Sequence, residues 1–303
     1  MLLIAPVILF ACTGGNEVSL FVGPGSAPSP KSSHTLAASP SVTRVPTPAP
    51  IPTLAPTAEP TPAPTAPPAP PPTLPPPPRP PPVLKPYVPP PVEGPAALVV
   101  RKGNTSLMAV VFSFDAGSDT GHTAQILDTL ASNGIRASFG ITGRWAEQNP
   151  ELLQRMVSEG HHLINHTYDH PSFTGRSSQI AALSRELRWA QLQRTEEIIA
   201  GLTGASTKPY FRPPFGDYDA SVNADVGAAG YGYNVLWTVD SRGWMGWPAG
   251  LITQRCLQLA VPGAIYVFHV GSASQDGPAL QGIIDGLRGR GYAIGAVPDV
   301  MAP

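Results

Sequence analysis

Proline is distributed unevenly along the 303-residue chain, and this distribution limits where a folded domain can lie. Residues 1–99 hold 30 of the 40 prolines and only seven charged residues. Proline lacks a backbone N–H, and the alanine and threonine around it offer few large side chains for a core. We therefore expect residues 13–97 to be a disordered linker and residues 98–303 to form one folded domain.

The first twelve residues, MLLIAPVILFAC, form an apolar run that is too short to span a bilayer as a helix. The run suits the hydrophobic region of an export signal, although no Lys or Arg precedes it. Its end, LFAC, resembles a bacterial lipobox, in which the cysteine is lipidated. We expect residues 1–12 to be an export signal and Cys12 to carry a lipid that anchors the chain to the membrane. The alternative is an apolar end with a chance cysteine.

The charge of the domain argues against nucleic acid as a partner, because its 15 basic and 17 acidic residues form no basic stripe. The two cysteines, Cys12 and Cys256, lie too far apart in the chain for a disulfide framework. We expect a monomer that works outside the cytoplasm, either anchored to the membrane or secreted to the cell wall.

From Leu98 onward, short apolar runs alternate with amphipathic stretches. Repeated strand–helix alternation is typical of parallel βα units, so we expect an α/β fold, a distorted (β/α) barrel of about seven parallel strands. The expected strands are 107–115, 136–142, 162–166, 209–212, 233–240, 264–269 and 292–297. The expected helices are 120–132, 150–159, 177–202, 220–229, 251–259 and 277–288.

Ionisable residues end five of these expected strands. The carboxyl ends of parallel strands form the mouth of a βα barrel, where catalytic groups lie, so we expect them to share one site. Each residue alone could instead cap the helix that follows its strand. The five residues are Asp115, His166, Arg212, Asp240 and His269.

The segment NHTYDHPSF places His166 and His170 four residues apart. On a helical turn this spacing directs two imidazoles to one face, as a divalent metal requires. Pro171 disfavours a helical conformation at His170, so we expect a tight turn or loop. A pair of histidines is more often structural, but the acidic residues Asp115 and Asp119 favour a metal site here.

Five motifs between residues 107 and 297 occur in the order found in the polysaccharide deacetylases, the NodB-homology group also called carbohydrate esterase family 4, which this part of the chain resembles. The resemblance implies a metal-dependent hydrolase that removes N-acetyl groups from a cell-envelope polysaccharide, with peptidoglycan or a chitin-like N-acetylglucosamine polymer as the expected substrate. The motifs here are SFDAG (113–117) for TFDDG, HTYDH (166–170) for HTxxH, RPPFG (212–216), DSRGW (240–244) for DxxDW, and IYVFH (265–269), a hydrophobic strand ending in histidine.

The resemblance assigns acid–base roles to four residues. Asp115 would be the general base, and Arg212 would keep its carboxylate ionised and aimed. His269 would be the general acid that protonates the leaving amine, and Asp240 would orient it.

The resemblance also implies a divalent metal held by His166 and His170, which we expect to be Zn²⁺, with Co²⁺, Mn²⁺ or Ni²⁺ as alternatives. The third ligand of the family, the second aspartate of TFDDG, is replaced by Ala116, whose methyl group cannot coordinate. Asp119 is the candidate replacement; alternatively, it caps the helix that follows.

Two aromatic residues are expected to bind substrate. The backbone N–H of Phe215 would help to stabilise the oxyanion, and Trp244 would form a wall of the acetyl pocket. Gly243 stands where the fourth motif of the family has a second aspartate, although Asp240 and Trp244 remain.

Two other functions stay open. An O-deacetylase of the acetylxylan esterase type would use the same catalytic residues. A catalytically weakened carbohydrate-binding wall protein would explain Ala116, but it would not need the acid–base residues that the chain retains.

Overall fold

The structure, a computed structural model, describes residues 96–301. The predicted export signal, Cys12 and all of the predicted linker except residues 96 and 97 lie outside the described residues. Within residues 96–301 we find no helix that combines the length and the apolar character needed to cross a bilayer.

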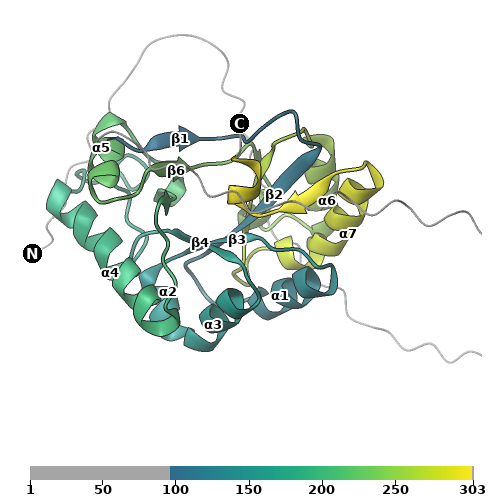
Figure 1. Ribbon diagram of the computed structural model, residues 1–303, viewed down its shortest axis with the longest axis horizontal. Coiled ribbons are helices and arrows are strands. Elements are labelled where there is room, and N and C mark those ends of the chain that lie inside the picture. Colours follow the sequence, from purple (N-terminus) through teal and green to yellow (C-terminus); the bar gives the residue numbers. More distant parts are fainter. Residues whose placement is uncertain (1–95, 302–303) are drawn as a thin grey trace, which may run out of the picture. The chain divides into compact units, whose positions relative to one another are not determined.

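One sheet of nine strands organises the described residues, and its paired strands run parallel. The sheet curls into a half-barrel in the order β1-β6-β5-β4-β3-β2-β8-β7, with β9 beside the start of β2 (Figure 1). This confirms the predicted α/β fold. The strands are β1 Leu98–Val100, β2 Ala109–Ala116, β3 Ser138–Ile141, β4 His162–Asn165, β5 Tyr210–Phe211, β6 Tyr233–Val235, β7 Val239–Asp240, β8 Ile265–His269 and β9 Ala293–Gly295.

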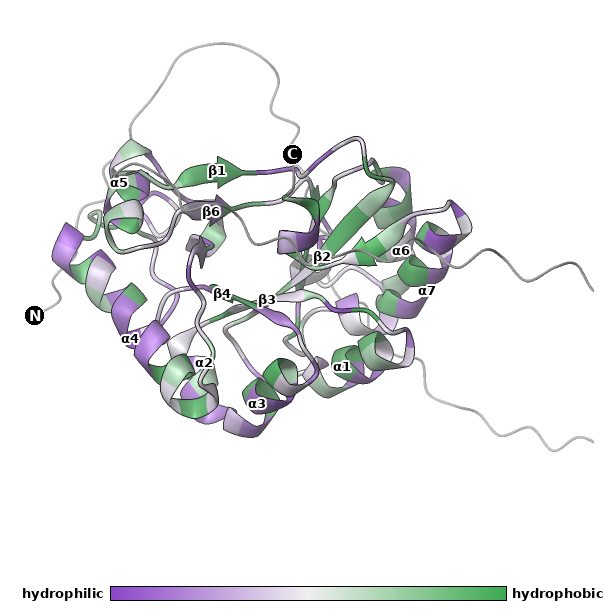
Figure 2. Ribbon diagram, in the orientation of Figure 1, coloured by the Kyte–Doolittle hydropathy of each residue, from purple (hydrophilic) through white to green (hydrophobic). Residues whose placement is uncertain are grey.

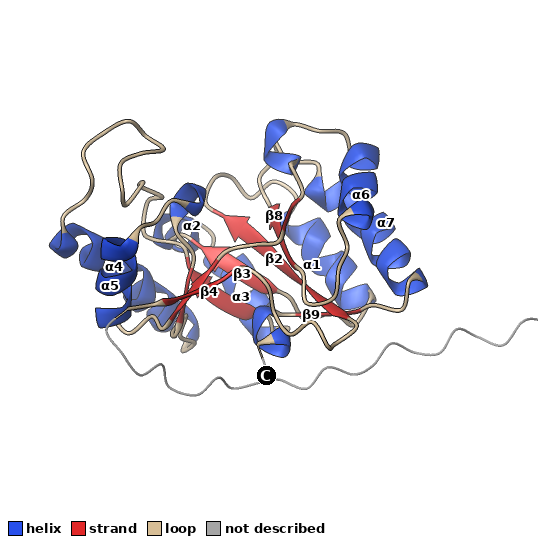
Figure 3. Cartoon of the chain, turned by 90° about the horizontal axis from the view of Figure 1, so that it is seen from above, coloured by secondary structure: helices blue, strands red, loops and turns tan. Residues whose placement is uncertain are grey.

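Helices cover the outside of the sheet, and Figure 3 shows α4 and α5 on one side and α6 and α7 on the other. In Figure 2 the strands are mainly hydrophobic, whereas hydrophilic residues are frequent along α4. The helices are α1 Thr123–Ser132, α2 Gly143–Gln148, α3 Pro150–Ser158, α4 Arg185–Thr203, α5 Ala220–Ala228, α6 Ala249–Gln258 and α7 Asp276–Gly289. Short 3₁₀ turns occur at η1 Pro214–Gly216, η2 Gly243–Met245 and η3 Val297–Val300.

Strand β2 shows how the sequence positions the site. All eight of its residues are buried, as expected for a parallel strand that is covered on both faces. Phe112 and Phe114 belong to the larger hydrophobic cluster, and Val111 belongs to a separate cluster. Because side chains alternate along a strand, Ser113 and Asp115 lie on the same side as Val111, away from the two phenylalanines.

The prediction of one strand over residues 233–240 was wrong. The run divides into β6, which pairs with β1 and β5, and β7, which pairs with β8 at the other edge of the sheet. Between them, Leu236 N–H donates to Val100 O at 2.8 Å, and Thr238 N–H donates to Ile265 O at 2.8 Å. The apolar run is continuous in sequence, but the chain crosses from one edge of the sheet to the other within it.

Two further differences concern local structure. The helix expected from residue 177 begins at Arg185, where the Ser184 side chain accepts a hydrogen bond from Leu187 N–H and caps the helix. The short elements β1 and α2 were not predicted from the sequence.

Candidate active site

A cavity of about 540 Å³ lies at the carboxyl ends of the parallel strands. Its position is the one expected for the site of a βα barrel. Arg212 is fully buried and Asp119 is exposed, and neither of them lines the cavity. The predicted site residues that line the cavity are Asp115, His166, His170, Phe215, Asp240, Trp244 and His269.

Arg212 supports Asp115 from within the barrel. Its Nη1 donates to Asp115 Oδ1 at 2.6 Å, and its Nη2 donates to Ser113 Oγ at 2.8 Å. Its Nε donates to Val235 O at 3.0 Å, so the planar guanidinium is held on three sides. Burial acts to raise the pKa of Asp115, but the charge and hydrogen bond of Arg212, together with His166 and His269, outweigh burial and hold that pKa below its usual range. Asp115 is therefore an ionised carboxylate with a fixed direction.

His269 lies directly opposite Asp115 in the register of β8 and β2. Burial acts to lower the pKa of His269, but a neighbouring carboxylate, Asp276, together with Asp115 and Asp240, raises it above its usual value. An ionised carboxylate and an imidazole whose protonated form is favoured by its neighbours thus lie on neighbouring strands at the mouth. This is the arrangement that general base and general acid catalysis requires.

His166 and His170 form a pair of neutral imidazoles. His166 Nδ1 lies 2.9 Å from Arg212 O and donates to it, which leaves Nε2 without a proton, 3.7 Å from Asp115 Oδ2. The two rings lie 4.8 Å apart between centroids. Burial lowers the pKa of both rings, that of His170 to about 3. His170 has φ +64° and lies outside any helix, which confirms the predicted tight turn or loop.

Asp119 does not join the two histidines. Its Oδ1 accepts a hydrogen bond from Ser272 N–H at 2.7 Å, and its Oδ2 accepts one from Ser272 Oγ at 2.7 Å. It does not cap the next helix either, because α1 begins at Thr123 with His122 at the N-cap position. Asp119 instead connects the loop after β2 to the loop after β8.

Ala116 lies on the opposite side of β2 from Asp115. It is fully buried in the larger hydrophobic cluster, together with Phe114. Among residues 96–301, no group of three His, Cys, Asp or Glu side chains is placed to hold a metal ion. The described residues therefore do not fit the three-ligand site that the resemblance implies, although two imidazoles are present.

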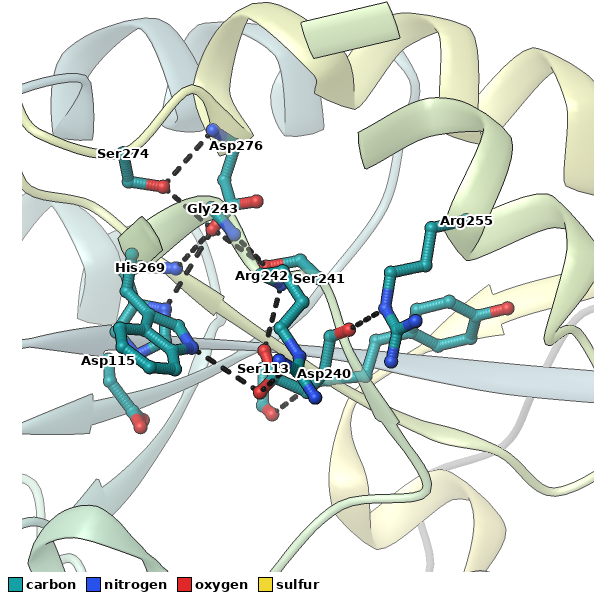
Figure 4. A network of polar contacts seen from close by, with 12 residues as sticks. Ser113, Asp115, Asp240, Ser241, Arg242, Gly243, Arg255, His269, Ser274 and Asp276 are labelled. Atoms are coloured by element: carbon teal, nitrogen blue, oxygen red, sulfur yellow. Dashed lines mark hydrogen bonds and ion pairs between the residues drawn. The ribbon is translucent and has the colours of Figure 1, made fainter. Parts of the chain in front are cut away.

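Asp240 binds two residues of the rim loop, the segment 241–246 that follows β7 beside the cavity. Its Oδ1 accepts a hydrogen bond from Arg242 N–H at 2.8 Å (Figure 4). Its Oδ2 accepts one from Trp244 Nε1 at 3.3 Å. Trp244 is 55% exposed, so its indole is available to a ligand. Phe215 is 54% exposed and has φ +61°; its ring packs edge-on against His170 with centroids 4.7 Å apart. The cavity thus has aromatic residues on two separate segments.

Asp276, the first residue of α7, was missed by the sequence analysis. It is fully buried, and its Oδ2 accepts hydrogen bonds from His269 N–H at 2.8 Å, Ser274 Oγ at 2.9 Å and Ser241 Oγ at 3.1 Å. The same oxygen lies 3.9 Å from His269 Nδ1. Asp276 belongs to none of the five motifs, and its only sequence signal is its position directly before the expected helix 277–288.

A half-barrel of parallel strands with Asp115 and His269 side by side at the cavity mouth is the arrangement of a hydrolytic enzyme. The family model for polysaccharide deacetylase matches residues 102–234. The chain is 30% identical to the peptidoglycan-N-acetylmuramic acid deacetylase PdaA of Bacillus subtilis, over 66% of this chain and 73% of that protein. It is 34% identical to a peptidoglycan-N-acetylglucosamine deacetylase of Bacillus cereus, over 59% of this chain and 60% of that protein.

A similar solved structure is a mutant, with restored enzymatic activity, of a carbohydrate esterase family 4 pseudoenzyme from Bacillus anthracis. It has a TM-score of 0.62 and 25% identity, over 68% of this chain and 72% of that one. The chain belongs to the polysaccharide deacetylase family, a class of hydrolases that act on carbon–nitrogen bonds other than peptide bonds.

Proposed function

We propose that this chain removes N-acetyl groups from a cell-envelope glycan, with peptidoglycan as the polymer. The observation that carries the proposal is the pairing of Asp115 with His269 across β2 and β8, at the cavity mouth. Both relatives described above are named as peptidoglycan deacetylases, one for N-acetylmuramic acid and one for N-acetylglucosamine, which supports peptidoglycan as the substrate.

The proposed reaction consumes one water for each acetyl group. Asp115 takes a proton from water as the water oxygen attacks the acetyl carbonyl carbon. The backbone N–H of Phe215 stabilises the oxyanion of the tetrahedral intermediate. The carbon–nitrogen bond then breaks, and His269 gives its proton to the leaving nitrogen. The products are acetate and a sugar with a free amine.

Arg212 contributes by holding Asp115 in its ionised form. Three hydrogen bonds fix the guanidinium, so the carboxylate cannot turn away from the cavity without losing a charged partner at 2.6 Å. Trp244 and Phe215 offer exposed aromatic faces beside the reacting groups, suited to the apolar faces of sugar rings.

Metal dependence is a separate part of the proposal. Deacetylases of this family generally use a divalent metal, and His166 and His170 are the described residues that could hold Zn²⁺ or a similar ion. Because Asp119 is bound to Ser272, these two imidazoles would need ligands from outside the described side chains. Chelation followed by metal addition tests this dependence directly.

Ala116 and the engaged Asp119 favour a second candidate, a wall protein that binds the glycan with weakened catalysis. The two candidates are separated by measuring acetate release from peptidoglycan, chito-oligosaccharides and acetylated xylan, with and without chelator. Acetate from N-acetylated substrates supports the deacetylase, and acetate from xylan alone indicates an O-deacetylase. Tight glycan binding without acetate release after metal addition would contradict the deacetylase.

We also propose that the chain acts outside the cytoplasm, held at the membrane by a lipid on Cys12 with residues 13–97 as a tether into the wall. The LFAC sequence and the proline-rich composition support this arrangement. Incorporation of labelled palmitate into the wild type, and its loss in Cys12→Ser, is the expected result. Equal labelling of both would contradict it.

A further inference from the structure

Gly243 leaves a space that another residue fills. A side-chain Cβ at position 243 would overlap the carboxylate of Asp276 and the hydroxyl of Ser274. The φ of Gly243 lies outside the left-handed region, so its backbone conformation does not itself require glycine. The missing side chain is explained by the carboxylate that comes from the start of α7, visible beside Gly243 in Figure 4.

Asp276 is placed to interact with the imidazole of His269. All three hydrogen bonds to its carboxylate reach Oδ2, and Oδ1 is buried without a partner. His269 Nδ1 is also buried without a partner, and it lies 3.9 Å from Oδ2. A buried carboxylate is costly unless its lone pairs are satisfied, so a small rotation that brings Nδ1–H to this carboxylate would satisfy both groups. The amino end of α7 further stabilises the negative charge.

Asp240 is less suited to the same role. Its two carboxylate oxygens accept hydrogen bonds from Arg242 N–H and Trp244 Nε1, both on the rim loop. Asp276, in contrast, contacts the backbone N–H of His269 itself.

We propose that Asp276, rather than Asp240, is the positioning residue for His269, and that position 243 is glycine because the Asp276 carboxylate occupies the space beside it. This inference rests on the proposed function for its catalytic consequence, because His269 is the proposed general acid. Asp276 touches no substrate in this account; it holds the Nδ1–H of His269 so that Nε2 faces the leaving nitrogen.

The first test does not depend on activity. The imidazole ¹⁵N signals and the pKa of His269 are measured by NMR in wild type, Asp276→Asn, Asp240→Asn and Asp285→Asn. Asp285 is the matched control, because it is exposed on the same helix and its carboxylate contacts Gln281. We expect Asp276→Asn to lower the pKa of His269 and shift its Nδ1 signal more than Asp240→Asn does, and Asp285→Asn to leave both unchanged. A larger change in Asp240→Asn would overturn the proposal.

The second test moves the carboxylate. Asp276→Asn is expected to lower kcat about 10–100-fold, the usual effect of losing a supporting partner, with KM within about twofold. Gly243→Asp in a Ser274→Ala/Asp276→Ala background removes both obstructing groups and supplies a carboxylate from position 243. We expect this triple variant to recover at least about tenfold in kcat over Ser274→Ala/Asp276→Ala.

The two tests have distinct outcomes. If kcat does not recover in the folded triple variant, the proposal that a carboxylate at position 243 can replace the one at position 276 is contradicted. If the wild type releases no acetate from any substrate, the proposed function fails, whereas the NMR comparison still decides between Asp276 and Asp240.

Discussion

Replacing Arg212 with methionine should destabilise the domain in a pH-dependent way. The guanidinium is fully buried and donates to Asp115 Oδ1 at 2.6 Å. Its removal leaves a buried carboxylate without a charged partner, a change that typically costs about 3–5 kcal/mol in the free energy of unfolding at pH 7. A domain of this kind has a free energy of unfolding of about 5–15 kcal/mol, so the variant should still fold but with a measurably lower free energy of unfolding.

The pH dependence follows from Asp115. In the wild type its pKa is lowered, so its contribution to stability is present above the ordinary carboxyl pKa and is lost as the pH falls through the lowered value. Without Arg212, burial raises the pKa of Asp115 instead, and the variant regains stability as the pH falls through that raised value. The difference between the two proteins should therefore shrink between pH 7 and about pH 4.

Urea unfolding at pH 7 and pH 4 measures this difference. Arg176→Met is the matched control, because the Arg176 side chain is 67% exposed and lies 3.5 Å from Asp219; it should change stability by less than about 1 kcal/mol. Asp115→Asn combined with Arg212→Met should be more stable at pH 7 than Arg212→Met alone. A cost for Arg212→Met below about 1 kcal/mol at pH 7, or an equal cost at both pH values, would show that Arg212 does not stabilise the ionised form of Asp115.

Three further predictions concern the site. A plot of kcat/KM against pH should have a broad plateau, because the lowered pKa of Asp115 sets the acidic limb and the raised pKa of His269 sets the alkaline limb. An acidic limb centred above about pH 6 would contradict this prediction. Trp244→Ala should raise KM about tenfold with kcat within about twofold if the exposed indole binds the sugar, as proposed, without joining the chemistry; an unchanged KM would contradict that role. Ala116→Asp should lower the melting temperature, since it buries a carboxylate in the hydrophobic cluster on the side of β2 away from Asp115, and Zn²⁺ should not restore more stability to it than to the wild type. A larger response of the variant to Zn²⁺ would show that a carboxylate at position 116 reaches the two histidines.

Much of the fold could be predicted because each buried strand carries its own signal. Strand β2 contains a mainly apolar run that leads to Asp115, one residue before the strand ends, and the register of the site follows from where such runs end. The run at 233–240 could not be divided from sequence, because the crossing of residues 236–238 between the two sheet edges depends on partners in β1 and β8. The short helix α2 has only six residues, too few for a periodic pattern.

The site residues that lie at the ends of strands could be predicted from the sequence. Asp276, which lies beyond the loop after β8, could not. Asp115 and His269 end strands, and their pairing follows from the parallel register. Asp276 lies seven residues beyond His269, and only the folded loop between β8 and α7 brings its carboxylate back to that histidine.

The loop after β8, residues 270–275, contacts the chain near both positions that depart from the family motifs, Ala116 and Gly243. Ser272 binds Asp119, the acidic residue nearest in sequence to Ala116 on the loop after β2. Ser274 and Asp276 occupy the space beside Gly243. The loop from residue 270 to 275 therefore contacts both the loop after β2, through Asp119, and the backbone at Gly243, and introducing an aspartate at position 243 alone should disturb it.

Acetate release from purified peptidoglycan tests the central claim most directly. The wild type should release acetate together with an equal amount of new sugar amine, and Asp115→Asn, which keeps the shape of the site but removes the base, should reduce the rate at least about 100-fold. A folded wild-type protein that releases no acetate from peptidoglycan or chito-oligosaccharides, with or without added divalent metal, would contradict the account.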